Sequence, residues 1–498
     1  MRLIPDFILP SRRAEQSIDS GAASQTLLAD PSGALERIVA DRLHPGLPPG
    51  PALPAVVQTL LYLLRPTSFL GWCHERYGDL FTLDTILFGV EVVVCHPEDV
   101  RRVFTGDPDV LRAGEANTLL EALVGKRSVL LLDGAEHLRQ RRLLMPPFHG
   151  ERMVAYARTM QETTERVIAG WPRGEVMPLH PSMQQITLEI ILRTIFGAEE
   201  AGELGELREA LAGLLDRIST GLSSLFLAPS LRFDLLGLSP WERYKRDRAY
   251  TDGLIYRKIA KRRTELLRGE RRDDVLSMLI CARDEDGQPL TDEELRDELM
   301  TLLVAGHETT ATMLCWAFEL VLADPRVLER LLAELDGVTR EDGVPSPAEL
   351  AKIPYLDAVI KEVLRLRPVI PAVGRVLKEP MELRGRRLPE GTLLAPSIYL
   401  VHHRADLYPE PHAFRPERFL EKKADPYAFF PFGGGIRRCL GMAFALFEMK
   451  IVLGTIFSRL TLAKARAEPA AVRVRTFTLA PDRGVLVRIA ERCVASAQ

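Results

Sequence analysis

The chain has 498 residues, of which 46% are hydrophobic and 27% are charged, and its formal net charge is −3. These values are typical of a large globular protein with a substantial core, and the small net charge gives no reason to expect nucleic-acid binding. The six cysteines follow no repeating spacing and form no CxxC or zinc pattern, which argues against a disulfide framework and favours a reducing compartment.

No apolar run reaches the length of a membrane-spanning helix. The best candidate, residues 52–64, contains Pro54 and is followed by Arg65 and Pro66, so it is too short for a bilayer core of roughly 30 Å. The first residues also lack the layout of a signal peptide. We therefore predict a cytoplasmic protein without a transmembrane segment, with peripheral membrane contact as the minority alternative.

The N-terminal part divides at a proline-rich run. Residues 1–43 are mixed in polarity and carry no motif, whereas residues 44–51 hold four prolines and two glycines. This composition excludes helix and central strand and predicts a stiff connector. We expect an N-terminal extension over residues 1–43, of unknown role, and one main domain over residues 44–498.

Three short patterns follow the connector. The β-branched and aromatic stretches 81–84 and 90–94 flank Gly89 and predict a hairpin. Pro97 begins the next predicted helix. Residues 105–130 show no clean period, so we expect irregular structure there.

A helix over residues 133–142 would place His137 and Arg141 on one face, because they stand four residues apart. Two donors on one face suit an anionic carboxylate; a solvated basic helix is the alternative, and the spacing alone does not decide. Amphipathic helix patterns fill most of residues 150–270. The apolar, proline-broken segment 225–238 interrupts them, and such a loop is normally buried core cover.

The longest predicted helix begins at the capping box of residues 291–294, and no proline interrupts it before Pro325. At roughly 30 residues it would span ~45 Å, enough to cross a domain. Gly306 and the threonines after it loosen a helix locally. A gap in the helix at Gly306, beside the acid Glu308 and the alcohol Thr309, suits oxygen chemistry. The gap would admit O₂, Thr309 would hold the O₂ or its water, and Glu308 would feed protons inward. Close helix packing through small residues is the alternative.

Residues 432–441 carry three consecutive glycines ahead of Cys439, so this backbone can turn sharply and approach a flat ligand. Residues 442–450 are strong helix formers without Gly or Pro, which places Cys439 just before a helix N-terminus. The helix dipole, nearby N–H groups, Arg437 and Arg438 favour a thiolate there. A thiolate so held suits an axial haem ligand; a structural cysteine on a tight turn is the alternative.

The spacing within this loop favours the haem ligand. Phe432, Gly435, Arg437 and Gly441 stand around Cys439 at spacings that resemble the haem-thiolate loop of the cytochrome P450 family. The resemblance includes four motifs in order and covers about residues 45–490. It implies a mainly α fold with small β-sheets: a single large helical domain that holds haem b between the long central helix and the cysteine loop.

The resemblance also implies the site residues. Those that would bind haem are His137, Arg141, Arg375, Phe432, Gly433, Gly435, Arg437, Gly441 and Cys439, with Cys439 as the iron ligand. Those that would activate oxygen are Ala305, Gly306, Glu308 and Thr309, with Glu rather than Asp as the acid. Glu362 and Arg365, by themselves an ordinary ion pair three residues apart, would join Arg418 in a folding element. The segments that would contact substrate are 105–130, 369–374 and 477–479, with 225–238 as the lid.

The implied reaction inserts one atom of O₂ into a C–H or C=C bond of a hydrophobic small molecule and releases the other as water. One alternative is a haem-thiolate peroxygenase or isomerase; such relatives depart from the acid–alcohol pair that Glu308 and Thr309 retain. Another is a non-catalytic haem-binding protein, which needs neither a proton relay nor a substrate lid. Because residues 47–51 look like a bacterial branch of fatty-acid and terpenoid hydroxylases, we rank long-chain fatty acids first and terpenoids or steroids second.

Electrons must come from a separate protein, because the chain has no GxGxxG after a strand and no four-cysteine cluster. Arg139, Arg142, Arg438 and Lys450 are expected near the thiolate side. A basic patch there would dock an acidic ferredoxin or flavodoxin, which works with its own reductase. We expect a monomer.

Overall fold

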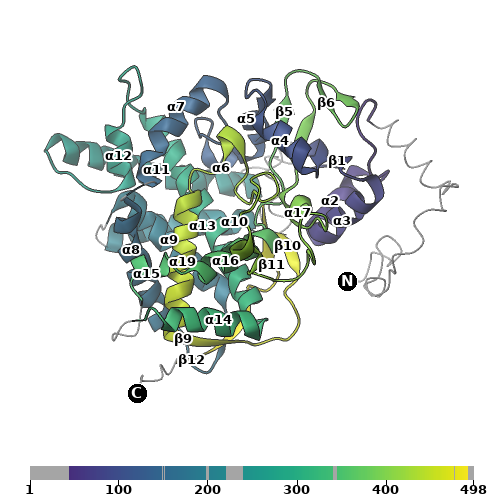
Figure 1. Ribbon diagram of the computed structural model, residues 1–498. Helices are drawn as coiled ribbons and strands as arrows, with labels where there is room; N and C mark the ends of the chain where they lie inside the picture. Colours follow the sequence, from purple (N-terminus) through teal and green to yellow (C-terminus); the bar gives the residue numbers. More distant parts are fainter. Residues whose placement is uncertain are drawn as a thin grey trace.

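The computed structural model describes residues 44–148, 150, 152–197, 201–219, 239–339, 345–475 and 477–491. The predicted N-terminal extension and the predicted lid at residues 225–238 lie outside these residues. Helices make up most of the described chain, as predicted (Figure 1). They are α2 (Ala55–Leu64), α3 (Pro66–Tyr77), α4 (Pro97–Thr105), α5 (Ala113–Ala116), α6 (Glu121–Val124), α7 (Gly134–Leu144), α8 (Arg152–Ala169), α9 (Leu179–Phe196), α10 (Ala201–Ser219), α11 (Pro240–Leu267), α12 (Val275–Cys281), α13 (Asp292–Val321), α14 (Pro325–Asp336), α15 (Pro347–Leu350), α16 (Pro354–Leu366), α17 (Ile398–His402), α18 (Arg418–Glu421) and α19 (Met442–Arg459).

Helix α13 lies at the centre of the fold (Figure 1). It is 30 residues long and begins at the predicted capping box, in which Thr291 Oγ1 accepts from the Glu294 N–H while the Glu294 carboxylate accepts from the Thr291 N–H. Helices α9, α11, α16 and α19 all pack against it. The prediction of a long helix that crosses the domain is therefore confirmed.

The strands form small sheets beside the helices (Figure 1). The largest has the order β1-β2-β8-β5-β3; β1 and β2 pair antiparallel, with Leu80 opposite Val94, so the predicted hairpin is confirmed. The others have the orders β4-β12-β9, β10-β11 and β6-β7. The strands are β1 (Leu80–Thr85), β2 (Gly89–Val94), β3 (Leu111–Arg112), β4 (Val176–Pro178), β5 (Arg375–Leu377), β6 (Met381–Leu383), β7 (Arg386–Leu388), β8 (Leu393–Pro396), β9 (Leu460–Lys464), β10 (Val472–Arg475), β11 (Thr478–Pro481) and β12 (Leu486–Glu491).

The segment predicted to be irregular, residues 105–130, consists of loops joined by the short elements β3, α5 and α6 and one 3₁₀ turn. Its end is fixed to the first half of α13. The Arg127 N–H donates to Asp297 Oδ2 at 2.8 Å, and the Ser128 and Thr301 hydroxyls share a hydrogen bond of 2.7 Å. These contacts give a defined position to a segment whose sequence has no regular pattern.

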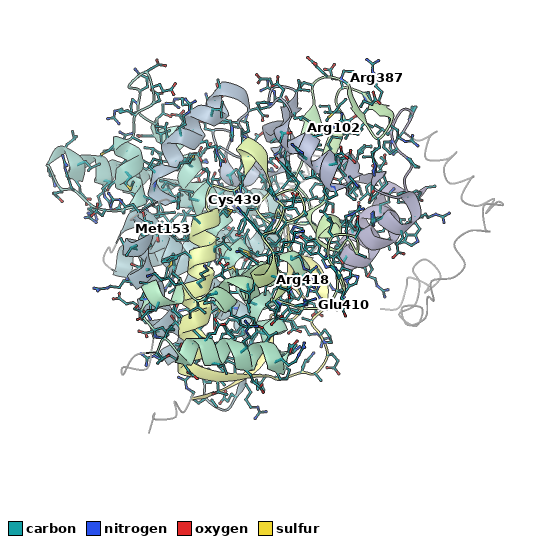
Figure 2. The ribbon with its side chains drawn as sticks, in the orientation of Figure 1. Arg102, Met153, Arg387, Glu410, Arg418 and Cys439 are labelled. Carbon is teal, nitrogen blue, oxygen red and sulfur yellow. The ribbon has the colours of Figure 1, made fainter. Side chains whose placement is uncertain are left out.

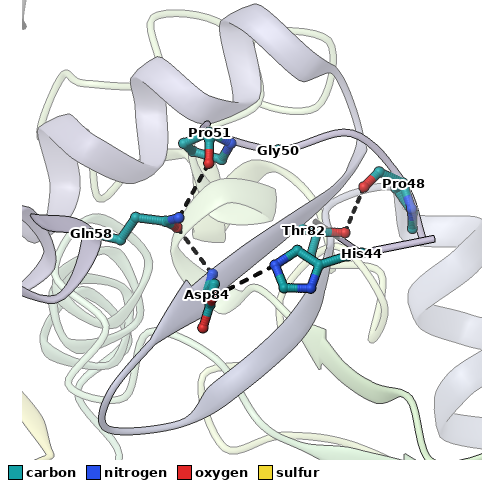
Figure 3. A pocket seen from close by; sticks show the side chains of 7 residues that line it. All are labelled: His44, Pro48, Gly50, Pro51, Gln58, Thr82 and Asp84. Atoms are coloured by element: carbon teal, nitrogen blue, oxygen red, sulfur yellow. Dashed lines mark hydrogen bonds and ion pairs between the residues drawn. The ribbon is translucent and has the colours of Figure 1, made fainter. Parts of the chain in front are cut away.

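The proline-rich connector lies against the first hairpin (Figure 3). Thr82 Oγ1 of the hairpin donates to Pro48 O of the connector at 2.6 Å. The Gln58 side chain also bridges the connector and the hairpin: it donates to Pro51 O at 3.2 Å and accepts from the Asp84 N–H at 3.0 Å. A Cβ on Gly50 would lie 1.9 Å from Thr82 O, so only glycine permits this close approach. Among the described residues, no helix has both the length and the apolar character that crossing a bilayer requires.

Candidate functional site

Cys439 lies on the loop that leads into α19 (Figure 2). The loop turns through Gly435, whose φ of +65° favours glycine and whose Cβ, if present, would lie 2.2 Å from Phe104 O. The Cys439 N–H donates to Phe432 O at 3.0 Å, and α19 follows with Gly441 as its N-cap residue. The predicted position of the cysteine, on a glycine loop before a helix N-terminus, is confirmed.

The charge state of Cys439 differs from the sequence-based expectation. Burial raises the pKa of its thiol, although the Gly441 N–H, Arg141 and Arg438 act to lower it. The predicted thiolate-favouring groups are therefore present, but in the free protein the loss of hydration outweighs them. The side chain lies deep in the molecule and is nevertheless exposed, and a residue meets both conditions when it lines an internal opening.

Helix α13 also presents an open position at its middle. Ala305 is exposed although most of this helix is buried, so it faces an internal opening. Thr309, one turn later, donates its hydroxyl to Ala305 O at 2.5 Å. Gly306 points elsewhere, because a Cβ there would lie 3.2 Å from Ile191 Cδ1 of α9. The structure thus favours the packing alternative for Gly306 and puts the open position at Ala305.

The side chains predicted to hold the haem carboxylates lie together. The pKa of His137 is lowered to about 3, first by burial and then by the positive charges of Arg437, Arg141 and Arg375. Burial also lowers the pKa values of Arg375 and Arg437 to about 10. His137, Arg375 and Arg437 line one cleft, together with Asp133.

This cleft carries more positive than negative charge. Asp133 is the only acid among its described lining residues, and its carboxylate already accepts from backbone N–H groups, including those of Ala113 and Gly114 at 3.0 and 2.9 Å. Arg437 donates to Leu130 O and Leu132 O, which are neutral. Because buried charges are normally paired, the cleft is suited to an anionic group.

Glu362, Arg365 and Arg418, implied to form a folding element, lie in direct contact. Arg365 donates from Nε and Nη2 to the two carboxylate oxygens of Glu362 at 2.7 and 2.8 Å, and Arg418 Nε donates to Glu362 Oε1 at 3.0 Å. The side chains of Glu362 and Arg365 are 0% exposed. Arg365 also donates to His402 O and Pro411 O, both at 2.8 Å, so it ties α16 to the chain that precedes the cysteine loop.

Glu308 does not share the open position of Ala305. Its side chain is buried against α9 and β10, where Gln184 Nε2 donates to Oε2 at 2.8 Å and Arg475 Nε lies 3.1 Å from Oε1. Burial would raise the pKa of Glu308, but His180, Arg475 and His307 lower it by more, so the net shift is downward. Gln184, His180 and Arg475 could not be expected from the sequence, because none of them stands at a local spacing from Glu308, whereas His307 is adjacent to it in the chain.

Two segments implied to face substrate meet beside α13. The Leu479 N–H donates to Val369 O at 2.7 Å, and Leu479 O accepts from Trp316 Nε1 of α13 at 2.8 Å. Ile370 and Phe477 remain partly buried next to this contact. The structure thus brings residues 369–374 and 477–479 together.

Three of the four members of the predicted basic docking patch form ion pairs with acids of the same chain. Arg139 pairs with Asp284 and Glu294, Arg142 with Glu285, and Lys450 with Asp357. Arg438 remains exposed beside Cys439. The sequence could not show this, because every acid involved lies far along the chain from its partner.

These features fit a haem. A haem needs a ligand for its iron, room for a flat apolar ring and cations for two carboxylates. Cys439 offers an accessible sulfur at an internal opening, and Ala305 leaves a small apolar surface on α13. The cleft lined by His137, Arg375 and Arg437 carries more positive than negative charge. The fold and the donor set together define a haem-thiolate protein.

The chain belongs to the cytochrome P450 family, whose family model, described as Cytochrome P450, matches residues 47–486. The protein assigned as cytochrome P450 135B1 in Mycobacterium tuberculosis is 42% identical over 444 residues, which cover 89% of this chain and 91% of that protein. The protein assigned there as cytochrome P450 135A1 is 37% identical and covers 91% of this chain and 97% of its own.

Solved structures agree with this assignment. The cyanobacterial CYP120A1 bound to retinoic acid has a TM-score of 0.76 at 25% identity and covers 90% of this chain and 100% of its own. A mutant cytochrome P450DA haem domain has a TM-score of 0.78 at 26% identity, covering 90% and 98%. The predicted fold, haem b as cofactor and the class of enzyme, a monooxygenase, are confirmed.

Proposed function

We propose that this cytochrome P450 hydroxylates or epoxidises a hydrophobic small molecule, with long-chain fatty acids first and terpenoids or steroids second. The observation that carries the proposal is the accessible thiol of Cys439, at an internal opening in a fold whose central helix is open at Ala305. The apolar residues Val369, Ile370 and Leu479 beside α13 support an apolar substrate. The retinoic acid in CYP120A1, a long apolar carboxylic acid, supports the same class.

The chain's own residues divide the work. Cys439 Sγ would hold the iron, and His137, Arg141, Arg375 and Arg437 would pair with the carboxylates. When bound, the haem supplies the activation of O₂, and electron donation by the thiolate favours cleavage of the O–O bond. The protein orients the substrate, excludes water from the site and supplies protons.

Thr309 and Glu308 would supply the protons. The Thr309 hydroxyl donates to Ala305 O, so its oxygen lone pairs can still accept a hydrogen bond from a water at the open face of α13. Glu308, next in the chain, holds an ionised carboxylate in a buried site. A proton taken up there could pass to the water at Thr309.

An exposed arginine group near the cysteine loop supports a separate electron donor, a ferredoxin or flavodoxin with its reductase. Arg438 is exposed, and α4, which carries the exposed Arg101 and Arg102, packs beside the 3₁₀ turn Gly435–Arg437. This arginine group replaces, as the proposed docking surface, the patch predicted from the sequence, in which three of the four basic residues pair with acids of the same chain. Positive charge here would favour an acidic partner and raise its association rate.

The proposal is tested by Thr309→Ala. The variant should keep its haem spectrum and substrate affinity and consume reductant at a comparable rate, but divert electrons into hydrogen peroxide. Because general acid–base assistance is worth roughly 10²–10⁴-fold, product per reductant oxidised should fall by at least ~10-fold. The measurement is product and peroxide per reductant, with a lipid library first screened for the compound that gives the largest low-spin to high-spin shift.

The matched control is Thr310→Ala, which removes a buried hydroxyl at the adjacent position of α13. It should leave coupling unchanged. Unchanged coupling in Thr309→Ala, or equal uncoupling in both variants, would contradict the role of Thr309. Full turnover with peroxide and no reductant would support the peroxygenase alternative.

A further inference from the structure

The cluster around Glu308 contains a histidine that no motif indicated. His180 stands in the first turn of α9, and its Nε2 lies 3.6 Å from Glu308 Oε1. The side chains of His180 and Glu308 are only 6% and 5% exposed. Arg475 Nε lies 3.1 Å from the same oxygen and is 30% exposed, so the cluster connects buried Glu308 to the surface.

The three atoms meet without completing hydrogen bonds. His180 Nε2, Glu308 Oε1 and Arg475 Nε are all buried and, among the described residues, lack a hydrogen-bond partner of suitable geometry. The distance of 3.6 Å between His180 and Glu308 is an ion-pair contact rather than a hydrogen bond. A small movement of either side chain, or one water, would connect them. The pair is thus arranged to exchange a proton.

Most of the described groups that face Glu308 cannot exchange a proton with it near neutral pH. Arg475 is permanently charged and Gln184 is neutral. His307, adjacent in the chain, has its pKa lowered to about 4, mainly by burial, and is therefore neutral. Burial also raises the pKa of Cys315, one of the groups within electrostatic reach of Glu308, so that thiol stays protonated.

Beyond these groups, Asp216 of α10 lies 3.9 Å from Arg475 and is 74% exposed, so it acts on the surface side of the cluster. Thr187 is paired with His307 at 3.0 Å and carries no charge. An imidazole is the side chain whose charge ordinarily changes in the neutral range. Among the described groups, His180 remains as one that can both donate and accept a proton within reach of Glu308.

We propose that His180 positions Glu308 and reloads it with protons during turnover. The step is a simple transfer: the N–H bond of the His180 imidazolium breaks, an O–H bond forms on the Glu308 carboxylate, and the imidazole then takes a proton from solvent. No oxidant or reductant is needed. The inference rests on the proposed function, because it assumes that protons pass from Glu308 toward Thr309.

The first test compares His180→Gln with Glu308→Gln and with His74→Gln. Glutamine keeps hydrogen-bonding capacity but cannot carry the proton. His74 is the matched control, because it pairs with Asp79 at 3.0 Å and none of the groups facing Glu308 contacts it. Each variant is loaded with haem and supplied with an electron donor and the lipid that gives the largest spin-state shift, and product and peroxide per reductant are measured from pH 5.5 to 8.5.

The wild type and His74→Gln should lose coupling as pH rises through the imidazole range. His180→Gln should lose product per reductant on the order of tenfold, less than a direct general acid because it acts through Glu308, and its coupling should not vary with pH over this range. A His180→Gln profile that matches the wild type would overturn the inference. If Glu308→Gln is also fully coupled, the proposed role of Glu308 fails as well; uncoupling in Glu308→Gln alone rejects only the role of His180.

A second readout does not depend on turnover. The infrared C=O band of protonated Glu308 can be assigned as the band that Glu308→Gln removes. Because His180 is among the groups that lower the pKa of Glu308, this band should appear at higher pH in His180→Gln than in the wild type. An unchanged titration would show that the two side chains are not coupled and would overturn the inference.

Discussion

At the scale of single residues, the setting of Cys439 determines the protonation state of its thiol. The glycine loop and the start of α19 hold the thiol at an internal opening. Burial raises the pKa of the thiol beyond what the nearby N–H and arginines can offset. A bound metal would therefore have to displace the proton, as metals do when they bind thiols.

Cys439→His should lose both the red-shifted Soret band of the reduced protein with CO and the monooxygenase activity, because that band requires a thiolate ligand. Cys281→Ser is the control: this cysteine is also exposed, so a general effect of thiol loss would appear there too. The control should keep the band. If Cys439→Ser retained it, another cysteine would be the ligand.

At the scale of elements, α16 is joined to the rest of the molecule by Arg365. The Arg365 guanidinium donates hydrogen bonds to Glu362 on its own helix and to three carbonyl oxygens, those of His402, Pro411 and Ala413. Because the side chains of Glu362 and Arg365 are both fully buried, removing one of them leaves an uncompensated charge.

Glu362→Ala should therefore cost roughly 3–5 kcal/mol of stability and give little haem-loaded protein. The control is Lys361→Ala on the same helix, which breaks a half-exposed pair with Asp357; such pairs contribute about 0–1 kcal/mol. Yield, haem content and the urea midpoint are the measurements. A normal yield and spectrum in Glu362→Ala would contradict the assigned role.

At the scale of the whole molecule, several buried histidines set the response to acid. Burial lowers the pKa of His402 to about 3 and that of His307 to about 4. Below the ordinary imidazole pKa of about 6.5, the unfolded chain binds protons that the folded chain does not. The stability contributed by these two histidines is therefore full above that value and is lost as pH falls from about 6.5 toward their folded-state pKa values.

His402→Gln should remove one group that binds a proton in the unfolded chain but not in the folded chain. His402 Nε2 accepts from the Phe430 N–H at 3.0 Å, a bond that the glutamine carbonyl can replace in kind. The free energy of unfolding, measured by urea titration between pH 4.5 and 7.5, should fall less steeply in the variant, by up to ~1.4 kcal/mol per pH unit. Equal slopes in the two proteins would show that His402 binds protons alike in the folded and unfolded states, which would contradict its lowered pKa.

The sequence by itself determined the features that depend on local spacing. The capping box before α13, the hairpin β1–β2 and the cysteine before α19 all follow from residues within a few positions of one another, because hydrogen-bond capping, β-propensity and glycine turns act over that range. The four motifs, being local, were enough to indicate the family.

Only the tertiary structure decided which distant groups meet. It paired Glu308 with Gln184, 124 residues away, and with His180 and Arg475, and it neutralised Arg139 with acids of α13 and the preceding loop. It also turned Gly306 toward α9 and left Ala305 open. Helical spacing fixes which residues share a face, but the partner of that face depends on how the helices pack, and that packing sets burial, charge pairing and pKa.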